Sequence, residues 1–221
     1  MSVEYALFSD AFFIKLDRLP AQQSVAVLIR HADRDSLPKN DVGYALPITD
    51  IGMQRAHGFG GKLGNRLATL HTSPLARCIQ TSEAIKAGAL VDVPVELDTM
   101  LGDPGVYVVD GQAAWPTWQK MGSQGVVEHL VTSDIPLPGM ADSNAAANHL
   151  IRHMKSIATG IPGVHVFVTH DAIIATTVAK VLNTSSKHLW PCFLEGAIFW
   201  FDDLITLDYR DSQVKLRLDM I

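Results

Sequence analysis

An apolar segment near the amino terminus ends in side chains suited to phosphoryl chemistry. Residues 24–29 read Ser-Val-Ala-Val-Leu-Ile, and the run stops at Arg30 and His31, with Arg34 a little further on. A neutral imidazole is a competent nucleophile at about pH 7, and guanidinium groups match phosphate oxygens with paired donors. The segment indicates a pocket for a phosphoryl group; the alternative is a strand end that simply reaches solvent.

Two later segments show the same change from apolar to polar side chains. One apolar run precedes Ser73 and Arg77, and another precedes His170 and Asp171. Open α/β sheets bind ligands at the carboxyl ends of their strands, so we expect the three segments to converge there. Taken singly, Arg77 would be a surface residue of a helix, and His170 a hydrogen-bonded histidine at a strand end.

The elements that must position these side chains alternate between strands and helices. Strands are predicted at 24–29, 68–72, 94–97 and 164–169, and helices at 4–17, from Thr49 to 67, from Ser73, at 143–159 and at 171–182. Thr49 and Ser73 are expected to cap their helices, with Pro74 at the first position of the second one. Residues 196–220 predict two more strands, partly antiparallel. This order favours an α/β fold of three α/β/α layers around a mostly parallel sheet.

Residues 101–142 interrupt the alternation. They are rich in glycine and proline among short helical pieces, which favours an inserted helical and loop lid rather than a second domain. We therefore expect residues 1–221 to form a single domain. The aromatic residues Tyr107, Trp115 and Trp118 are expected to pack under this lid.

Composition and charge exclude several classes of protein. The chain has 221 residues, 48% of them hydrophobic, and a formal net charge of −5 without a basic block, so a nucleic-acid partner is not expected. No apolar run approaches the roughly 20 residues that span a bilayer, and the amino terminus lacks the pattern of a secretory signal. Cys78 and Cys192 have neither metal-binding nor redox spacing. These features predict a cytoplasmic protein with no membrane partner; the sequence assigns no oligomeric state.

Four short motifs, in order along residues 24–182, resemble those of the histidine phosphatase superfamily, which includes phosphoglycerate mutase-like enzymes and histidine acid phosphatases. They are Arg30-His31-Ala32-Asp33-Arg34, Thr49-Asp50-Ile51-Gly52, Ser73-Pro74-Leu75-Ala76-Arg77-Cys78-Ile79-Gln80-Thr81 and Val168-Thr169-His170-Asp171. The Arg34 and Asp171 positions are similar to the acid-phosphatase form. Ala32 departs from the glycine of the family signature. If the position needs a positive φ or a close backbone approach, alanine would strain it or narrow the pocket, which puts the efficiency of the site in question but not the nucleophile.

The resemblance implies a function and a set of roles. His31 would attack phosphorus and form a phosphohistidine that water then hydrolyses. The phosphate-binding groups would be Arg30, Arg34, Arg77 and His170. Such cations can replace a metal ion, so we expect no metal and no cofactor, and a small phosphorylated molecule as the substrate.

The general acid has two candidates. Asp171 follows His170 directly, as in the acid phosphatases, whereas Asp103 lies where the mutase-like branch places its acidic donor. Their ordinary roles would be a helix N-cap for Asp171 and a turn residue for Asp103. The sequence interpretation favours Asp171.

The sequence therefore predicts a metal-independent phosphatase that hydrolyses a phosphomonoester or phosphoramidate. The alternatives are a phosphoglycerate mutase-type phosphotransferase, a non-catalytic relative that binds phospho-ligands, and a phosphatase of phosphohistidine in proteins. Two further patterns favour ordinary structural roles: the helical spacing of His149 and His153 is more typical of a helix surface than of a metal site, and Trp190, Phe193 and Phe199 are expected in the core.

Overall fold

A seven-stranded mixed sheet forms the centre of the computed structural model, which describes residues 11–19, 23–37, 41 and 43–217. The strands are β1 (Ser24–Arg30), β2 (Leu67–Thr72), β3 (Val95–Leu97), β4 (Gly163–Thr169), β5 (Gly196–Phe201), β6 (Ile205–Tyr209) and β7 (Ser212–Leu216). Their order in the sheet is β3-β2-β4-β1-β5-β6-β7. The strands β3, β2, β4 and β1 are parallel, and β5, β6 and β7 continue the sheet antiparallel to their neighbours. The α/β fold is confirmed, and the carboxyl-terminal part contributes three strands rather than two.

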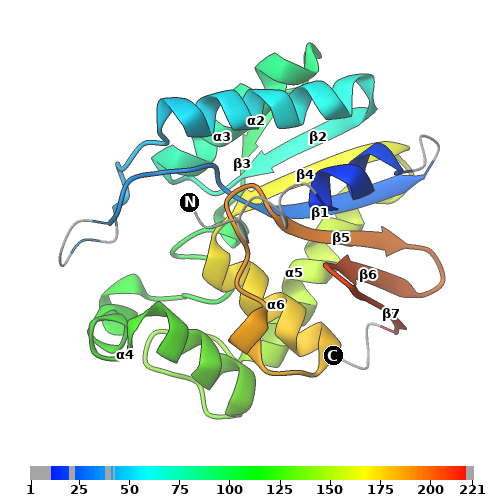
Figure 1. The fold of residues 1–221 in the computed structure, drawn as a ribbon. Helices are drawn as coiled ribbons and strands as arrows, with labels where there is room; N and C mark the ends of the chain where they lie inside the picture. The colour runs from blue at the N-terminus through cyan, green and yellow to red at the C-terminus, as the bar shows by residue number, and fades with distance from the viewer. Residues whose placement is uncertain (1–10, 20–22, 38–40, 42, 218–221) are drawn as a thin grey trace.

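Helices cover both faces of the sheet (Figure 1). They are α2 (Asp50–Leu63), α3 (Ala76–Ala89), α4 (Gly111–Thr132), α5 (Ser143–Ala158) and α6 (Asp171–Leu182), with 3₁₀ turns η1 (Gly64–Arg66), η2 (Thr99–Leu101) and η3 (Ser186–His188). In Figure 1, α2 and α3 lie on one face of the sheet, and α5 and α6 lie on the other. Residues 11–17 are also helical; the rest of the helix predicted at 4–17 lies outside the described residues.

Alternating side chains of β1 divide the core into two clusters, one on each face of the sheet. Val25, Val27 and Ile29 pack in the cluster that includes side chains of α2 and α3. Ala26 and Leu28 pack in the cluster that includes side chains of α4, α5 and α6. Both faces of the central strand are therefore buried, as its continuous apolar run indicates.

Glycines let α2 and α3 pack closely, although they make α2 weak by intrinsic propensity. A Cβ at Gly60 would lie 1.9 Å from the carbonyl oxygen of Ile85, and one at Gly88 would lie 1.9 Å from that of His57. No side chain fits at either position. The glycines that weaken the isolated helix are thus the residues that let its backbone touch the neighbouring helix.

The segment that the sequence predicts as a lid contains one long helix and little regular structure besides. In α4 the chain bends at Gly122, whose φ is 67°. Figure 1 shows α4 away from the sheet, and its contacts are mainly with α6. Tyr107 is buried and Trp118 packs against the adjoining core cluster. Among the described residues, no helix is long and apolar enough to cross a membrane.

Candidate active site

The parallel strands β2, β4 and β1 are neighbours, so their carboxyl ends lie side by side. Arg30 is in register with Thr169, and Thr72 with Val168. The residues that follow each strand therefore meet: the ring centroids of His31 and His170 are 5.6 Å apart. The structure brings together the three segments that the sequence singled out.

His31 is buried and has a defined tautomer. The residue is only 2% exposed, and its Nδ1 lies 2.8 Å from the carbonyl oxygen of Ala32. A carbonyl oxygen only accepts, so Nδ1 carries the proton and Nε2 keeps its lone pair. Burial, together with the neighbouring His170 and Arg30, holds the pKa of His31 well below its ordinary value. The imidazole is neutral at neutral pH and can act as a nucleophile through Nε2.

Arg30 is fixed from three sides. Its Nη2 is 2.8 Å from Oδ2 of Asp171, and its Nη1 donates to the carbonyl oxygen of Pro191 at 2.9 Å. The guanidinium carbon lies 4.0 Å from the ring centroid of Phe193, whose ring is also 5.6 Å from that of His31. Phe193 was predicted as a core residue, and this is wrong: it is partly exposed and lies against the two residues of the central motif. Nothing in the local sequence pattern distinguishes it from a core aromatic.

Arg77 and His170 contact each other and the turn after β2. Nη2 of Arg77 lies 3.3 Å from Nδ1 of His170, and Oγ of Ser73 lies 3.0 Å from its Nε2. Because arginine only donates, Nδ1 of His170 accepts and Nε2 carries the proton that it donates to Ser73. Burial, with the charges of Arg77, Arg30 and Arg34, holds the pKa of His170 well below its ordinary value.

The helix after β2 begins later than predicted. α3 starts at Ala76 with Leu75 as its N-cap residue, and no side chain caps it. The prediction that Ser73 caps this helix and that Pro74 is its first residue is wrong. The hydroxyl of Ser73 accepts from His170 instead. Because the helix begins two residues later than expected, Arg77 reaches His170 at the end of β4.

Arg34 adds a third positive charge at the edge of the site. Its side chain is partly exposed, and its Nη1 donates to the carbonyl oxygen of Asp35 at 2.8 Å. Burial and the charges of Arg30 and Arg77 lower its pKa. Within the described chain, the Nε atoms of all three arginines are buried without a hydrogen-bond partner. The site therefore holds several donors and a concentrated positive field.

The two acidic candidates have different surroundings. Both carboxylate oxygens of Asp171 are engaged: Oδ2 by Arg30, and Oδ1 by the amide of Ala172 at 2.9 Å. Asp103 accepts a hydrogen bond of 3.0 Å from the hydroxyl of Tyr44 at Oδ2, and its Oδ1 is buried with no partner among the described residues. Burial raises the pKa of Asp103. Tyr44 carried no signal in the sequence analysis.

Ala32 occupies the glycine position of the family signature without strain. It is not among the described non-glycine residues with positive φ, and its side chain is fully buried in the core cluster that includes α2. Its amide donates to Oγ1 of Thr81 at 3.0 Å. The methyl group therefore packs in the core, and the alanine causes no backbone strain at this position.

The described residues contain no group of three side chains that could hold a metal ion. Nε2 of His153 lies 2.6 Å from Oδ2 of Asp98, which gives that histidine a structural partner. Phe199 is in the core as predicted, whereas Trp190 is partly exposed.

Comparisons with known proteins identify the family and the fold. The family model described as histidine phosphatase superfamily (branch 1) matches residues 26–199. No curated protein sequence matches the chain. Among solved structures, a phosphoserine phosphatase mutant from Entamoeba histolytica in complex with phosphoserine has a TM-score of 0.55 at 16% identity, over 86% of this chain and 94% of that one.

Two further solved structures are similar at the level of the fold. A phosphoglycerate mutase from Bacillus anthracis has a TM-score of 0.55 at 15% identity, over 90% of this chain and 96% of that one. A mycobacterial glucosyl-3-phosphoglycerate phosphatase has a TM-score of 0.53 at 18% identity, over 86% and 100%. The family match spans most of the chain and includes each of the three converging strand ends, so the chain belongs to the histidine phosphatase superfamily.

Proposed function

We propose that this protein is a metal-independent phosphatase that hydrolyses a small phosphomonoester through a covalent phosphohistidine on His31. The observation that carries the proposal is the Nδ1 hydrogen bond of His31 to the carbonyl of Ala32, which leaves Nε2 free as a nucleophile beside Arg30 and His170. Splitting the displacement into two steps and stabilising charge with fixed cations are the two contributions that such a site supplies.

The reaction that we propose has two steps. Nε2 of His31 attacks phosphorus, the bond from phosphorus to the leaving oxygen breaks, and an acid donates a proton to that oxygen. Water then attacks phosphorus and gives its proton to the same carboxylate, the bond from phosphorus to Nε2 of His31 breaks, and phosphate and the neutral imidazole are released. The cations Arg30, Arg34 and Arg77 bind the phosphoryl oxygens and stabilise their charge in both steps, and His170 joins them by donating its Nε2 proton to phosphate in place of Ser73.

We propose Asp103 as the acid and Asp171 as the residue that orients Arg30. A general acid needs a carboxyl group that stays protonated close to neutral pH, and the burial of Asp103 acts in that direction. Asp171 has both oxygens occupied, one of them by an arginine at 2.8 Å. The contacts thus favour Asp103 as the acid, whereas the sequence interpretation favoured Asp171.

The experiment is hydrolysis of p-nitrophenyl phosphate with and without EDTA. We expect His31→Ala to lower kcat by more than about a thousand-fold and the chelator to have no effect. Quenched samples with ³²P-labelled substrate should carry an acid-labile label on the wild type and none on His31→Ala. Chelator-sensitive turnover, or an active His31→Ala variant, would contradict the proposal.

Leaving-group dependence identifies the acid. With Asp103→Asn, we expect a loss of about 100-fold or more on phenyl phosphate and a much smaller loss on p-nitrophenyl phosphate, whose leaving group needs less protonation. Asp171→Asn should lower both rates by similar factors and weaken binding of inorganic phosphate. If instead the loss in Asp171→Asn depended on the leaving group and the loss in Asp103→Asn did not, Asp171 would be the acid.

A further inference from the structure

Tyr44 contacts the carboxyl group that we propose as the acid. Its hydroxyl donates to Oδ2 of Asp103 at 3.0 Å. The other oxygen, Oδ1, is buried and has no hydrogen-bond partner in the described chain. Gly111, the first residue of α4, lies against Oδ1, since a Cβ there would be 2.9 Å away. The two oxygens of one carboxyl group thus have different surroundings.

The backbone around Tyr44 is attached to the start of the helix that carries Arg77. Nη1 of Arg77 donates to the carbonyl oxygen of Gly43 at 2.6 Å, and the amide of Ala76 donates to the carbonyl oxygen of Tyr44 at 3.2 Å. The amide of Leu46 closes the turn on Gly43 at 3.1 Å. One short segment therefore contacts both a phosphate-binding arginine and the acid. Its contacts fix where the Tyr44 hydroxyl lies.

We infer that Tyr44 is a positioning residue that orients the carboxyl group of Asp103 and stabilises the carboxylate left after proton transfer. The inference rests on the proposed role of Asp103. The Tyr44 hydroxyl donates to Oδ2 in both protonation states, because a carboxyl oxygen can accept whether or not the group is ionised. The bond to a charged carboxylate is the stronger one, so it favours the product of proton transfer.

The proton balance of the step is simple. The phosphorus–oxygen bond breaks, the leaving oxygen takes the proton of Asp103, and Asp103 becomes a carboxylate. Water later returns a proton to Asp103 as its oxygen bonds to phosphorus and the bond from Nε2 of His31 to phosphorus breaks. Tyr44 keeps its own proton throughout; burial, Asp103 and its hydrogen bond together raise the pKa of Tyr44 to about 12. Among the described residues, the charge of Arg77 also acts on Tyr44, in the direction that lowers its pKa.

The test is the substitution Tyr44→Phe, which removes one hydroxyl from a side chain that is 45% exposed. We expect kcat/KM for phenyl phosphate to fall about fivefold, the equivalent of one net hydrogen bond, with less than a twofold change for p-nitrophenyl phosphate. Loss of the donor makes the carboxylate less stable, so the pKa of Asp103 rises. The descending limb of the pH–rate profile for phenyl phosphate should move to higher pH by about one unit.

Tyr107→Phe is the matched control. It also removes a tyrosine hydroxyl, one that lies 2.9 Å from Oγ1 of Thr177 rather than on the carboxyl group that Tyr44 contacts. We expect this variant to keep the wild-type ratio of the two esters and the wild-type pH profile. If Tyr107→Phe changes the ratio of the two rates or the pH profile, the effects of Tyr44→Phe reflect a general loss of stability, and the inference is overturned.

The outcomes separate this inference from the proposed function. If the loss of activity in Asp103→Asn does not depend on the leaving group, Asp103 is not the acid and the inference about Tyr44 is also wrong. If the loss in Asp103→Asn does depend on the leaving group, Asp103 remains the acid. In that case the role of Tyr44 is wrong if Tyr44→Phe lowers kcat/KM equally for both esters, or leaves the descending limb of the pH–rate profile in place.

Discussion

At the scale of single residues, the backbone carbonyl of Ala32 determines which nitrogen of His31 can react. It accepts from Nδ1, and the amide of the same residue is held by Oγ1 of Thr81. Thr81 itself donates to the carbonyl oxygen of Arg77 at 2.7 Å. A chain of three hydrogen bonds therefore joins the proposed nucleophile to the helix turn that carries a phosphate-binding arginine.

Restoring the family glycine with Ala32→Gly should lower stability without raising activity. The methyl group is fully buried and the residue is not among those with positive φ, so glycine loses packing and gains entropy in the unfolded chain. We expect the free energy of unfolding to fall by about 1 kcal/mol, measured by urea denaturation. An increase in kcat would show that the methyl group does restrict the site.

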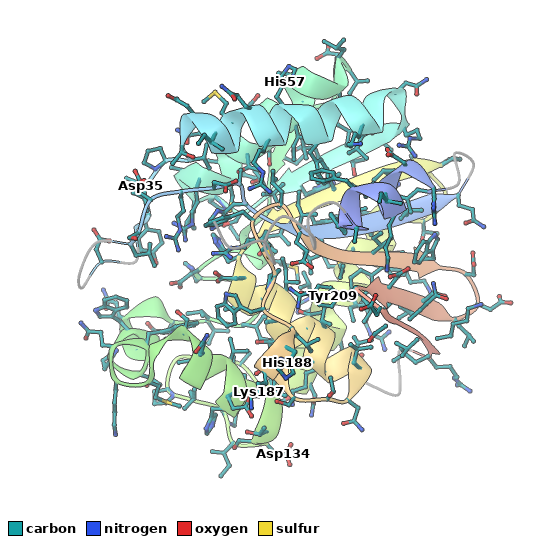
Figure 2. All side chains as sticks on the ribbon, viewed as in Figure 1. Asp35, His57, Asp134, Lys187, His188 and Tyr209 are labelled. Atoms are coloured by element: carbon teal, nitrogen blue, oxygen red, sulfur yellow. The ribbon has the colours of Figure 1, made fainter. Side chains whose placement is uncertain are left out.

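At the scale of elements, the antiparallel end of the sheet supports the arginine at its centre. Arg210, in the turn between β6 and β7, pairs with Glu195 at 2.7 Å and donates to the carbonyl oxygen of His188 at 2.6 Å. The hydroxyl of Tyr209 donates to the carbonyl oxygen of Leu189 at 2.8 Å. Figure 2 labels Tyr209 on β6 and His188 beside α6. These bonds fix residues 188–195, which carry the contacts of Arg30 with Pro191 and Phe193.

The substitution Arg210→Gln should therefore weaken both the fold and phosphate binding. Glu195 is 2% exposed and would lose its charged partner, so we expect the free energy of unfolding to fall by about 3–5 kcal/mol. Inhibition by inorganic phosphate should need a several-fold higher concentration.

The control is Lys62→Gln, which removes an exposed ion pair with Asp17 of 3.3 Å. It should cost less than about 1 kcal/mol and leave phosphate inhibition unchanged. Equal phosphate inhibition in wild type and Arg210→Gln would contradict the supporting role of this turn.

Sequence patterns predicted the parts of this site that follow strand ends, because an apolar run that stops at charge has a strong local signature. They did not predict the start of α3, since the hydroxyl of Ser73 contacts His170, the residue after β4, instead of capping the helix. Phe193 and Tyr44 were missed for the same reason: each acts through a contact with a residue distant in the sequence. The choice between Asp103 and Asp171 depended on burial and on an ion pair, which no spacing reports.

At the scale of the whole molecule, the site concentrates positive charge within a chain whose formal net charge is −5. The histidines in it are kept neutral by burial and by neighbouring arginines. A group whose pKa is lowered on folding binds its proton more readily in the unfolded chain. Stability is therefore complete above the unfolded value of about 6.5 and decreases as pH falls below it.

We expect the free energy of unfolding to decrease between about pH 6.5 and 5, with His31 contributing up to about 1.4 kcal/mol per pH unit and His170 acting in the same direction. Denaturant titrations at several pH values measure this slope. His31→Gln should make the slope shallower. A wild-type protein equally stable at both ends of this range would contradict it.

The close contact of α2 and α3 at their glycines determines which positions of these helices tolerate substitution. Since Gly60 and Gly88 each face a backbone carbonyl at a distance that leaves no room for a methyl group, even alanine must push the two helices apart. Arg77 lies near one end of this pair and Thr49, the N-cap of α2, lies at the corresponding end of the other helix. Separating the helices at their far ends would tilt both near ends. Variants at these two buried glycines should therefore lose activity, while exposed positions of α2, such as Met53 and Gly58, accept replacement.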